Sequence, residues 1–155
     1  DLHSFPTRRS SDLVVAVFGN GPYEASVAGE IRPGAEFYDV DAKYHSGGST
    51  EIIIPADVSD TQMKKLKEEA KIAARAIDCK GICRMDSFIK ADGGEIFINE
   101  VNTMPGFTEI SMYPKLWEAS GISNKELLER IIDYGYEAYK GKSSRNAALR
   151  WARKV

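Results

Sequence analysis

The chain has 155 residues, of which 43% are hydrophobic and 28% are charged, so it holds enough apolar material for one globular core. Its formal net charge of −2 gives no electrostatic reason to expect nucleic acid or an anionic membrane as a partner. No apolar stretch is long enough to span a bilayer, and two cysteines, Cys79 and Cys83, are too few for a disulfide framework. We therefore expect a cytoplasmic protein with reduced thiols, no nucleic-acid partner and no membrane association.

The first half of the chain predicts strands and one long loop. Residues 1–13 are polar and unpatterned, and we interpret them as a leader or as a remnant of cloning or sequence assembly. Residues 13–20 are apolar and β-branched and end in glycine and proline, which predicts a buried strand followed by a turn. A second strand is predicted over residues 24–33, and we expect Gly29 to interrupt it. The loop that follows, to residue 56, is long, and such loops are often functional.

Three helices are predicted beyond this loop. Ser59 and Gln62 have the spacing of a capping box, and apolar residues then recur at helical intervals as far as Ile77. A short helix is predicted over residues 114–120. The last helix is predicted to begin with a second capping box, formed by Ser123 and Glu126. Its apolar side consists of Leu127, Leu128, Ile131, Ile132 and Tyr139.

The most informative segment is a predicted hairpin with an Asp-Gly-Gly turn. Because side chains alternate along a strand, Arg84 and Asp86 share one face of its first strand, and Glu100 and Asn102 share one face of its second. For Asp86 to lie opposite Glu100, the loop must hold an odd number of residues, and a three-residue loop over 92–94 satisfies this. A two-residue turn would place the two acids on opposite faces unless a bulge corrected the register.

The four polar residues of the hairpin have the chemistry of a cation site. Two carboxylates at that spacing repel each other unless one is protonated or a cation lies between them. With Asn102, they offer three oxygen ligands, which favours Mg²⁺ with coordination positions left for a polyphosphate. Arg84 can bind a phosphate or a developing oxyanion. Spacing alone leaves open the alternative that these residues form the solvent side of an ordinary amphipathic hairpin.

Residues around the hairpin add to this hypothesis. Ile96 and Ile98 indicate a partly buried floor beneath the acids. The irregular segment after the second strand contains Gly106, whose N–H a ligand can approach closely because no Cβ blocks it, and Ser111, whose hydroxyl can bind a carboxylate. Cys83 points to the face opposite Arg84 and is predicted to lie in the core.

Residues 81–122, including NEVNTMPGFT and SMYPKLW, closely resemble the C-terminal part of the D-alanine–D-alanine ligases, a family of the ATP-grasp superfamily. EFYDVDAKY and STEIIIPA are similar to the mobile loop of that family and to the strand after it. The likeness implies an α/β (α+β) fold, the ATP-grasp C-terminal catalytic lobe over residues 14–140, with a largely antiparallel sheet and helices packed on one side of it. Residues 141–155 would form a basic tail.

The resemblance also implies roles for the hairpin residues. Asp86, Glu100 and Asn102 would bind two Mg²⁺ ions together with ATP, with Glu100 bridging the two ions and Mn²⁺ as an alternative metal. Arg84 and the amide of Gly106 would polarise the carbonyl group under attack.

Four further residues receive roles from the same resemblance. Ser111 and Met112 would bind the carboxylate of the second D-alanine, Ser111 by its hydroxyl and Met112 by its backbone. Lys43 would contact the transferred phosphate, and Tyr44 would close the loop over the acceptor. Relatives that form a D-alanine–D-lactate ester lack this tyrosine, so Tyr44 favours the dipeptide.

The implied function is the ATP-dependent ligation of two D-alanines through a D-alanyl phosphate, a step in peptidoglycan synthesis that supports the cell wall and cell shape. Full-length members are usually homodimeric and carry N-terminal and central domains, so we expect the isolated chain to be nearly inactive. Three alternatives are compatible with the sequence: another ATP-grasp carboxylate–amine ligase, a non-catalytic metal- or nucleotide-binding module, and a plain structural domain.

Overall fold

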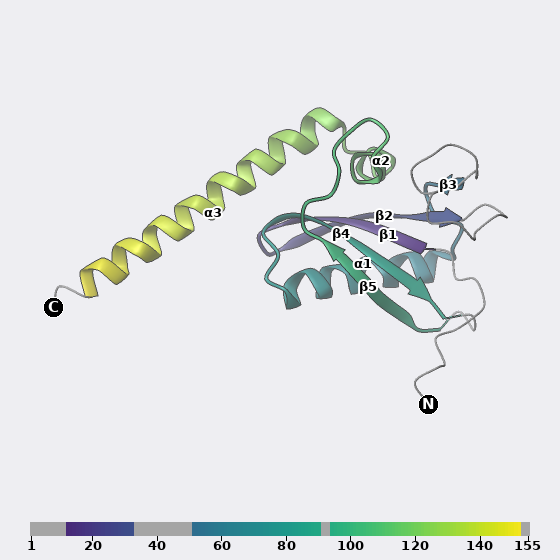
Figure 1. Cartoon of the computed structure of the whole chain (residues 1–155), viewed down its shortest axis with the longest axis horizontal. Helices are drawn as coiled ribbons and strands as arrows, with labels where there is room; N and C mark the ends of the chain where they lie inside the picture. Colours follow the sequence, from purple (N-terminus) through teal and green to yellow (C-terminus); the bar gives the residue numbers. More distant parts are fainter. Residues whose placement is uncertain (1–11, 33–50, 91–93, 153–155) are drawn as a thin grey trace, which may run out of the picture.

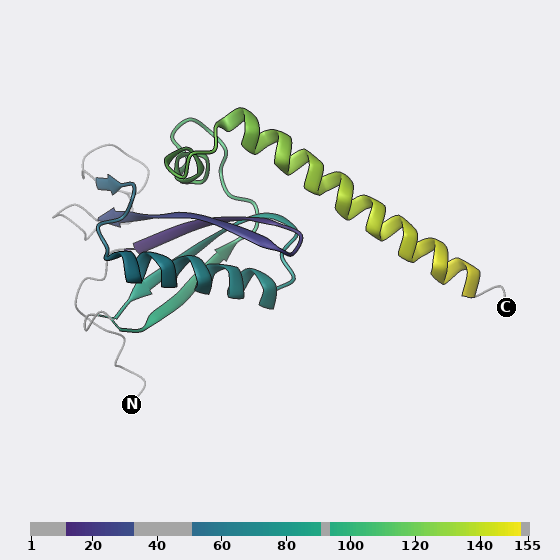
Figure 2. The same ribbon diagram turned by 180° about the vertical axis from the view of Figure 1, so that it is seen from behind.

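A computed structural model describes residues 12–32, 51–90 and 94–152, with side chains described as far as residue 142. Its described strands form one antiparallel sheet in the order β3-β2-β1-β4-β5 (Figure 1, and from behind in Figure 2). The elements are β1 (Asp12–Gly19), β2 (Tyr23–Arg32), β3 (Glu51–Ile53), α1 (Asp60–Ala76), β4 (Gly81–Ile89), β5 (Ile96–Asn102), α2 (Met112–Ala119) and α3 (Asn124–Ala152). The predicted α/β fold with an antiparallel sheet and packed helices is confirmed. Within the described ranges, none of the helices combines the length and apolar character needed to cross a membrane.

The sheet lies between two helical layers, so the expectation that the helices pack on one side of it is wrong. Helix α1 covers one face, and α2 with the first turns of α3 covers the other (Figure 1). The central strand β1 is buried on both faces, with Val15 and Val17 packed toward α1 and Val14 toward α2. Burial on both sides explains why residues 13–19 are a continuous apolar run and do not alternate with polar residues.

Helix α1 begins as predicted. The Ser59 hydroxyl accepts a hydrogen bond from the Gln62 amide at 3.3 Å, and the Gln62 side chain accepts one from the Ser59 amide at 3.0 Å, which completes the capping box. The residues that α1 buries against the sheet are Leu66, Ala70 and Ala74. Ile77 is the C-cap residue and is half exposed, so the apolar face ends about one turn earlier than its spacing indicates.

Strand β2 runs through Gly29 without interruption, so the predicted break is wrong. The glycine serves close packing. A Cβ atom at this position would lie 2.8 Å from Met112 Cε and 2.9 Å from Leu116 Cδ2, both on α2. The missing side chain therefore lets α2 approach the sheet.

Helix α2 begins at Met112, two residues before the predicted start. Pro114 occupies its third position, where a proline is tolerated because the first amides of a helix have no partner within the helix. Trp117 and Tyr113 pack the helix on the sheet, as predicted. The Trp117 ring lies 4.2 Å from that of Phe18, and the Tyr113 hydroxyl donates to the Val17 carbonyl at 2.9 Å.

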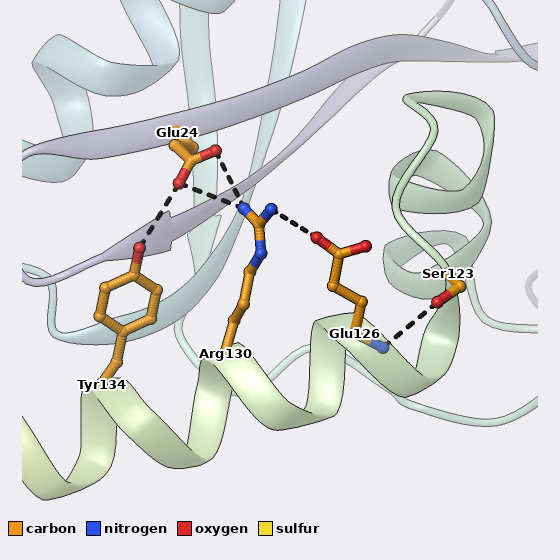
Figure 3. A network of polar contacts seen from close by, with 5 residues as sticks. All are labelled: Glu24, Ser123, Glu126, Arg130 and Tyr134. Carbon is orange, nitrogen blue, oxygen red and sulfur yellow. Dashed lines mark hydrogen bonds and ion pairs between the residues drawn. The ribbon is translucent and has the colours of Figure 1, made fainter.

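A polar cluster fixes the first turns of α3 to the sheet (Figure 3). Arg130 donates to the carboxylates of Glu24 on β2 and Glu126 on α3, and its guanidinium lies 5.6 Å from the Phe18 ring centroid. The Tyr134 hydroxyl donates to Glu24 at 3.5 Å. We call Glu24, Glu126, Arg130 and Tyr134 the α3 clamp.

Beyond the clamp, α3 extends away from the sheet (Figures 1 and 2). Ser123 accepts a hydrogen bond from the Glu126 amide at 3.3 Å, as its spacing predicts. Leu127 is buried, but the predicted apolar side is otherwise largely open, since Leu128, Ile132 and Tyr139 are exposed. The helix is continuous across the boundary predicted at 140/141 between lobe and basic tail, and that division stays a prediction.

Candidate active site on the β4–β5 ribbon

Strand β4 presents two different faces. Cys83, Met85 and Ser87 are buried on the α1 side of the sheet, as predicted for Cys83, and burial raises the pKa of the Cys83 thiol. Arg84 and Asp86 lie on the other face, beside Ala16 and Val14 of β1, with which they pair. Since Ala16 and Val14 are fully buried, Arg84 and Asp86 lie at the margin of the core and are themselves only partly exposed.

The register of the ribbon brings the four predicted residues together. Arg84 pairs with Asn102, and Asp86 pairs with Glu100, so all four share one face, as predicted. The predicted three-residue loop lies mostly outside the described residues, but the ladder next to it does not have the odd-numbered register that this loop requires. Lys90 already bonds to Glu95, which leaves the four positions 91–94 between them.

An even number of residues between the strands would place Asp86 and Glu100 on opposite faces, and a bulge corrects the register, as predicted for a two-residue turn. Asp86 pairs with Glu100 but Ser87 pairs with Ile98, so Asn99 is an extra residue in β5. The expectation that Ile96 and Ile98 form the floor of the site is therefore wrong. Both lie on the face of Ser87, toward α1, whereas Glu100 lies on the opposite face.

Arg84 and Asp86 form a bidentate ion pair. The distances are 2.7 Å from Nε to Oδ1 and 2.7 Å from Nη2 to Oδ2. This hydrogen bonding, together with the charges of Asp86 and Glu100, raises the pKa of Arg84, while its partial burial acts in the opposite direction. The positive charge therefore stays beside both acids across the physiological pH range.

The oxygen donors of this face suit a hard divalent cation. The described part of the chain has no group of three or more His, Cys, Asp or Glu residues able to hold a metal, and the ribbon instead offers two acids and one amide. Arg84 uses two of the roughly four lone-pair directions of Asp86, so this carboxylate can still bind a cation. The Asn102 amide oxygen accepts from the Met104 amide at 3.0 Å and keeps its second lone pair.

A second group of predicted residues meets in the loop between β5 and α2. A Cβ atom on Gly106 would lie 2.9 Å from the Ser111 hydroxyl oxygen, so the glycine backbone and this hydroxyl are close neighbours. Phe107 packs on Tyr113 with ring centroids 5.8 Å apart, and Pro105 is buried, which holds the loop against α2. Gly106 and Ser111 are thus brought together by a fixed loop.

The remaining predicted residues divide into two groups. The Met112 side chain is buried against Gly29, which leaves its backbone as the part that can serve a ligand. Lys43 and Tyr44 lie outside the described residues.

One residue of this loop was missed by sequence reasoning. The Thr108 amide donates to the Ser111 hydroxyl oxygen at 3.0 Å, and the two hydroxyl oxygens lie 2.9 Å apart. The spacing of two hydroxyl residues three apart, directly before a helix, was the signal that could have identified it.

The solved structures that this chain resembles include two D-alanine ligases. The D-alanine–D-alanine ligase from Coxiella burnetii matches 95% of this chain and 38% of its own, with a TM-score of 0.80 and 29% identity. The VanG D-Ala:D-Ser ligase from Enterococcus faecalis matches 81% of this chain and 36% of its own, with a TM-score of 0.72 and 31% identity. The fold is therefore that of an ATP-grasp ligase.

Sequence comparison places the chain within that class. Residues 7–133 match the family described as D-ala D-ala ligase C-terminus, and the chain belongs to this family. The D-alanine–D-alanine ligase of Heliobacterium modesticaldum is 49% identical over 142 residues. That alignment covers 92% of this chain and 38% of the relative, so the chain spans little more than a third of the curated protein.

Proposed function

We propose that this chain supplies the metal-binding and acceptor-binding end of an ATP-dependent D-alanine–D-alanine ligase, acting in the cytoplasm in peptidoglycan synthesis. One observation carries the proposal. Asp86 and Glu100 lie directly opposite each other on one face of the ribbon, with Arg84 and Asn102 paired beside them. Such a concentration of acids around one guanidinium serves phosphate chemistry better than it serves folding.

Three residues of the ribbon are assigned to the metal. Asp86, Glu100 and Asn102 would hold Mg²⁺, or Mn²⁺, as a pair of ions with ATP. When bound, the metal neutralises the charge of the phosphates during phosphoryl transfer. Arg84, kept cationic and fixed by its bidentate contact, stabilises the negative charge that develops on the reacting group.

The loop before α2 is assigned to the acceptor. Ser111 and the Met112 backbone would bind the carboxylate of the second D-alanine, while the Gly106 amide would face the carbonyl under attack. Lys43 and Tyr44 complete the proposal, as the contact to the transferred phosphate and the cover of the acceptor site. The full-length protein is proposed to be a homodimer that forms a D-alanyl phosphate and then the dipeptide.

Calorimetric titration of the purified chain with Mg²⁺ and Mn²⁺ tests the metal assignment. We expect saturable heat in the parent chain and its loss in Asp86→Asn and Glu100→Gln, because each removes a charged oxygen ligand. Asp133→Asn, an exposed acid on α3, is the matched control and should bind as the parent does. Equal heats from the parent and both ribbon variants would remove the support for a metal site here.

A further inference from the structure

In the turn before α2, the backbone of Ser111 caps the helix while its side chain bonds elsewhere. Ser111 is the N-cap residue of α2 by its backbone, with φ −70° and ψ 140°, yet its side chain makes no capping hydrogen bond. Its hydroxyl oxygen is instead bound to Thr108, which contributes an amide at 3.0 Å and a hydroxyl at 2.9 Å. The Ser111 amide donates back to the Thr108 carbonyl at 2.9 Å, which closes the turn.

Pro114 weakens the usual capping role of Ser111. An N-cap serine normally accepts a hydrogen bond from the second or third amide of its helix. The third residue of α2 is Pro114, which has no N–H. The helix thus withholds one of the two amides that would otherwise engage the Ser111 hydroxyl.

We propose that Thr108 is a positioning residue that presets Ser111 as a hydrogen-bond donor to the acceptor's carboxylate. A serine hydroxyl has one proton and two lone pairs. When the Thr108 amide and hydroxyl both donate to Ser111, both lone pairs are occupied, and the Ser111 proton is the group left to bind a ligand. Thr108 is itself exposed and needs no contact with the substrate.

The chemistry of a carboxylate ligand requires that the Thr108 hydroxyl donates to the Ser111 hydroxyl, and not the reverse. An ionised carboxylate only accepts hydrogen bonds, so it can bind Ser111 only if Ser111 donates outward. Thr108 must then donate to Ser111, and this order costs little because the amide contact already holds Ser111 in place. This inference rests on the proposed role of Ser111 as a carboxylate ligand, and it adds the residue that orients it.

The test is an NMR titration of the ¹⁵N-labelled chain with D-alanyl-D-alanine, followed at the amides of residues 106–112. Four proteins are compared: the parent, Ser111→Ala, Thr108→Val and Thr108→Ser. Valine keeps the shape of threonine but lacks the hydroxyl, whereas serine keeps the hydroxyl. Thermal unfolding of each variant confirms that the fold is retained.

We expect Ser111→Ala to abolish saturable shifts and Thr108→Val to raise the dissociation constant about 3- to 10-fold, the effect of losing one neutral hydrogen bond. Thr108→Ser should restore binding to the parent level, which a purely structural role of the threonine side chain would not predict. Loss of binding in Ser111→Ala with parent-like binding in Thr108→Val would overturn the inference alone. Parent-like binding in Ser111→Ala, or no saturable shift in the parent, would overturn the proposed acceptor site and the inference with it.

Discussion

The two faces of β4 are built from neighbouring residues of one strand but differ in burial and in charge. Toward α1, Cys83, Met85 and Ser87 are fully or almost fully buried in a packed core. Toward α2, Arg84 and Asp86 form a charged pair that is partly open to solvent. Adjacent positions in the sequence thus contribute separately to the core and to the proposed site, because a strand alternates its side chains between faces.

Substitutions on the two faces of β4 should separate these roles. Met85→Ala removes a fully buried side chain and should lower the free energy of unfolding by about 2–5 kcal/mol, measured by urea denaturation. Its folded fraction should still bind Mg²⁺ as the parent does. Asp86→Asn should show the reverse, with a smaller stability loss because Arg84 keeps an acceptor oxygen. Loss of metal binding in folded Met85→Ala would break the distinction between the faces.

The sheet face toward α2 also contains a closely packed contact, between Gly29 of β2 and helix α2, and a substitution of Gly29 tests how closely the two elements pack. Gly29→Ala places a methyl group within 3 Å of Met112 and Leu116, so we expect a loss of about 1–3 kcal/mol by thermal unfolding. Gly135→Ala is the matched control, since that glycine lies in α3 with open space around it. There, alanine should instead stabilise by about 0.5–1 kcal/mol. A neutral Gly29→Ala would show that α2 can move away at no cost.

The α3 clamp should give the smallest effect. Arg130→Gln removes ion pairs with the exposed carboxylates of Glu24 and Glu126 and a contact with the ring of the buried Phe18. Because the two ion pairs are open to solvent, we expect a loss of less than about 1 kcal/mol. Much of that loss should disappear in about 1 M salt, which screens exposed charges. A double-mutant cycle with Glu24→Gln isolates the pair, and a coupling that persisted at high salt would indicate a contact better shielded than the exposure of these groups implies.

The chemistry of the ribbon was more predictable than its backbone. The requirement that two acids and an arginine act together was enough to predict that Asp86 faces Glu100, which the register confirms. A bulge was named as the condition for a two-residue turn, but its position at Asn99 was not predictable, because residues 96–102 have the pattern of an uninterrupted strand whose isoleucines and acid share one face. A bulge depends on pairing with the neighbouring strand, and a single strand's pattern carries no sign of it.

Packing between elements far apart in the sequence was the other feature that the sequence did not predict. Gly29 was expected to break its strand because glycine is unfavourable there in isolation, but its value lies in contacts with Met112 and Leu116, more than 80 positions away in the sequence. Leu128 and Ile132 follow the helical period that Leu127 and Ile131 also follow, yet they stay exposed. Periodicity identifies an apolar helix face and does not determine how much of it a partner covers.

The bulge at Asn99 also bears on how the outer edge of β5 can pair with strands of other molecules. Strand β5 is the last strand of the described sheet, so the backbone groups along its outer side have no neighbouring strand there. A straight edge of this kind would offer a template for strands of other molecules, and amyloid-like growth begins at such edges. Interrupting the ladder in mid-strand, next to the charge of Glu100, leaves an incoming strand only short runs to pair with, so the residue that aligns the candidate site also makes this edge a poorer template.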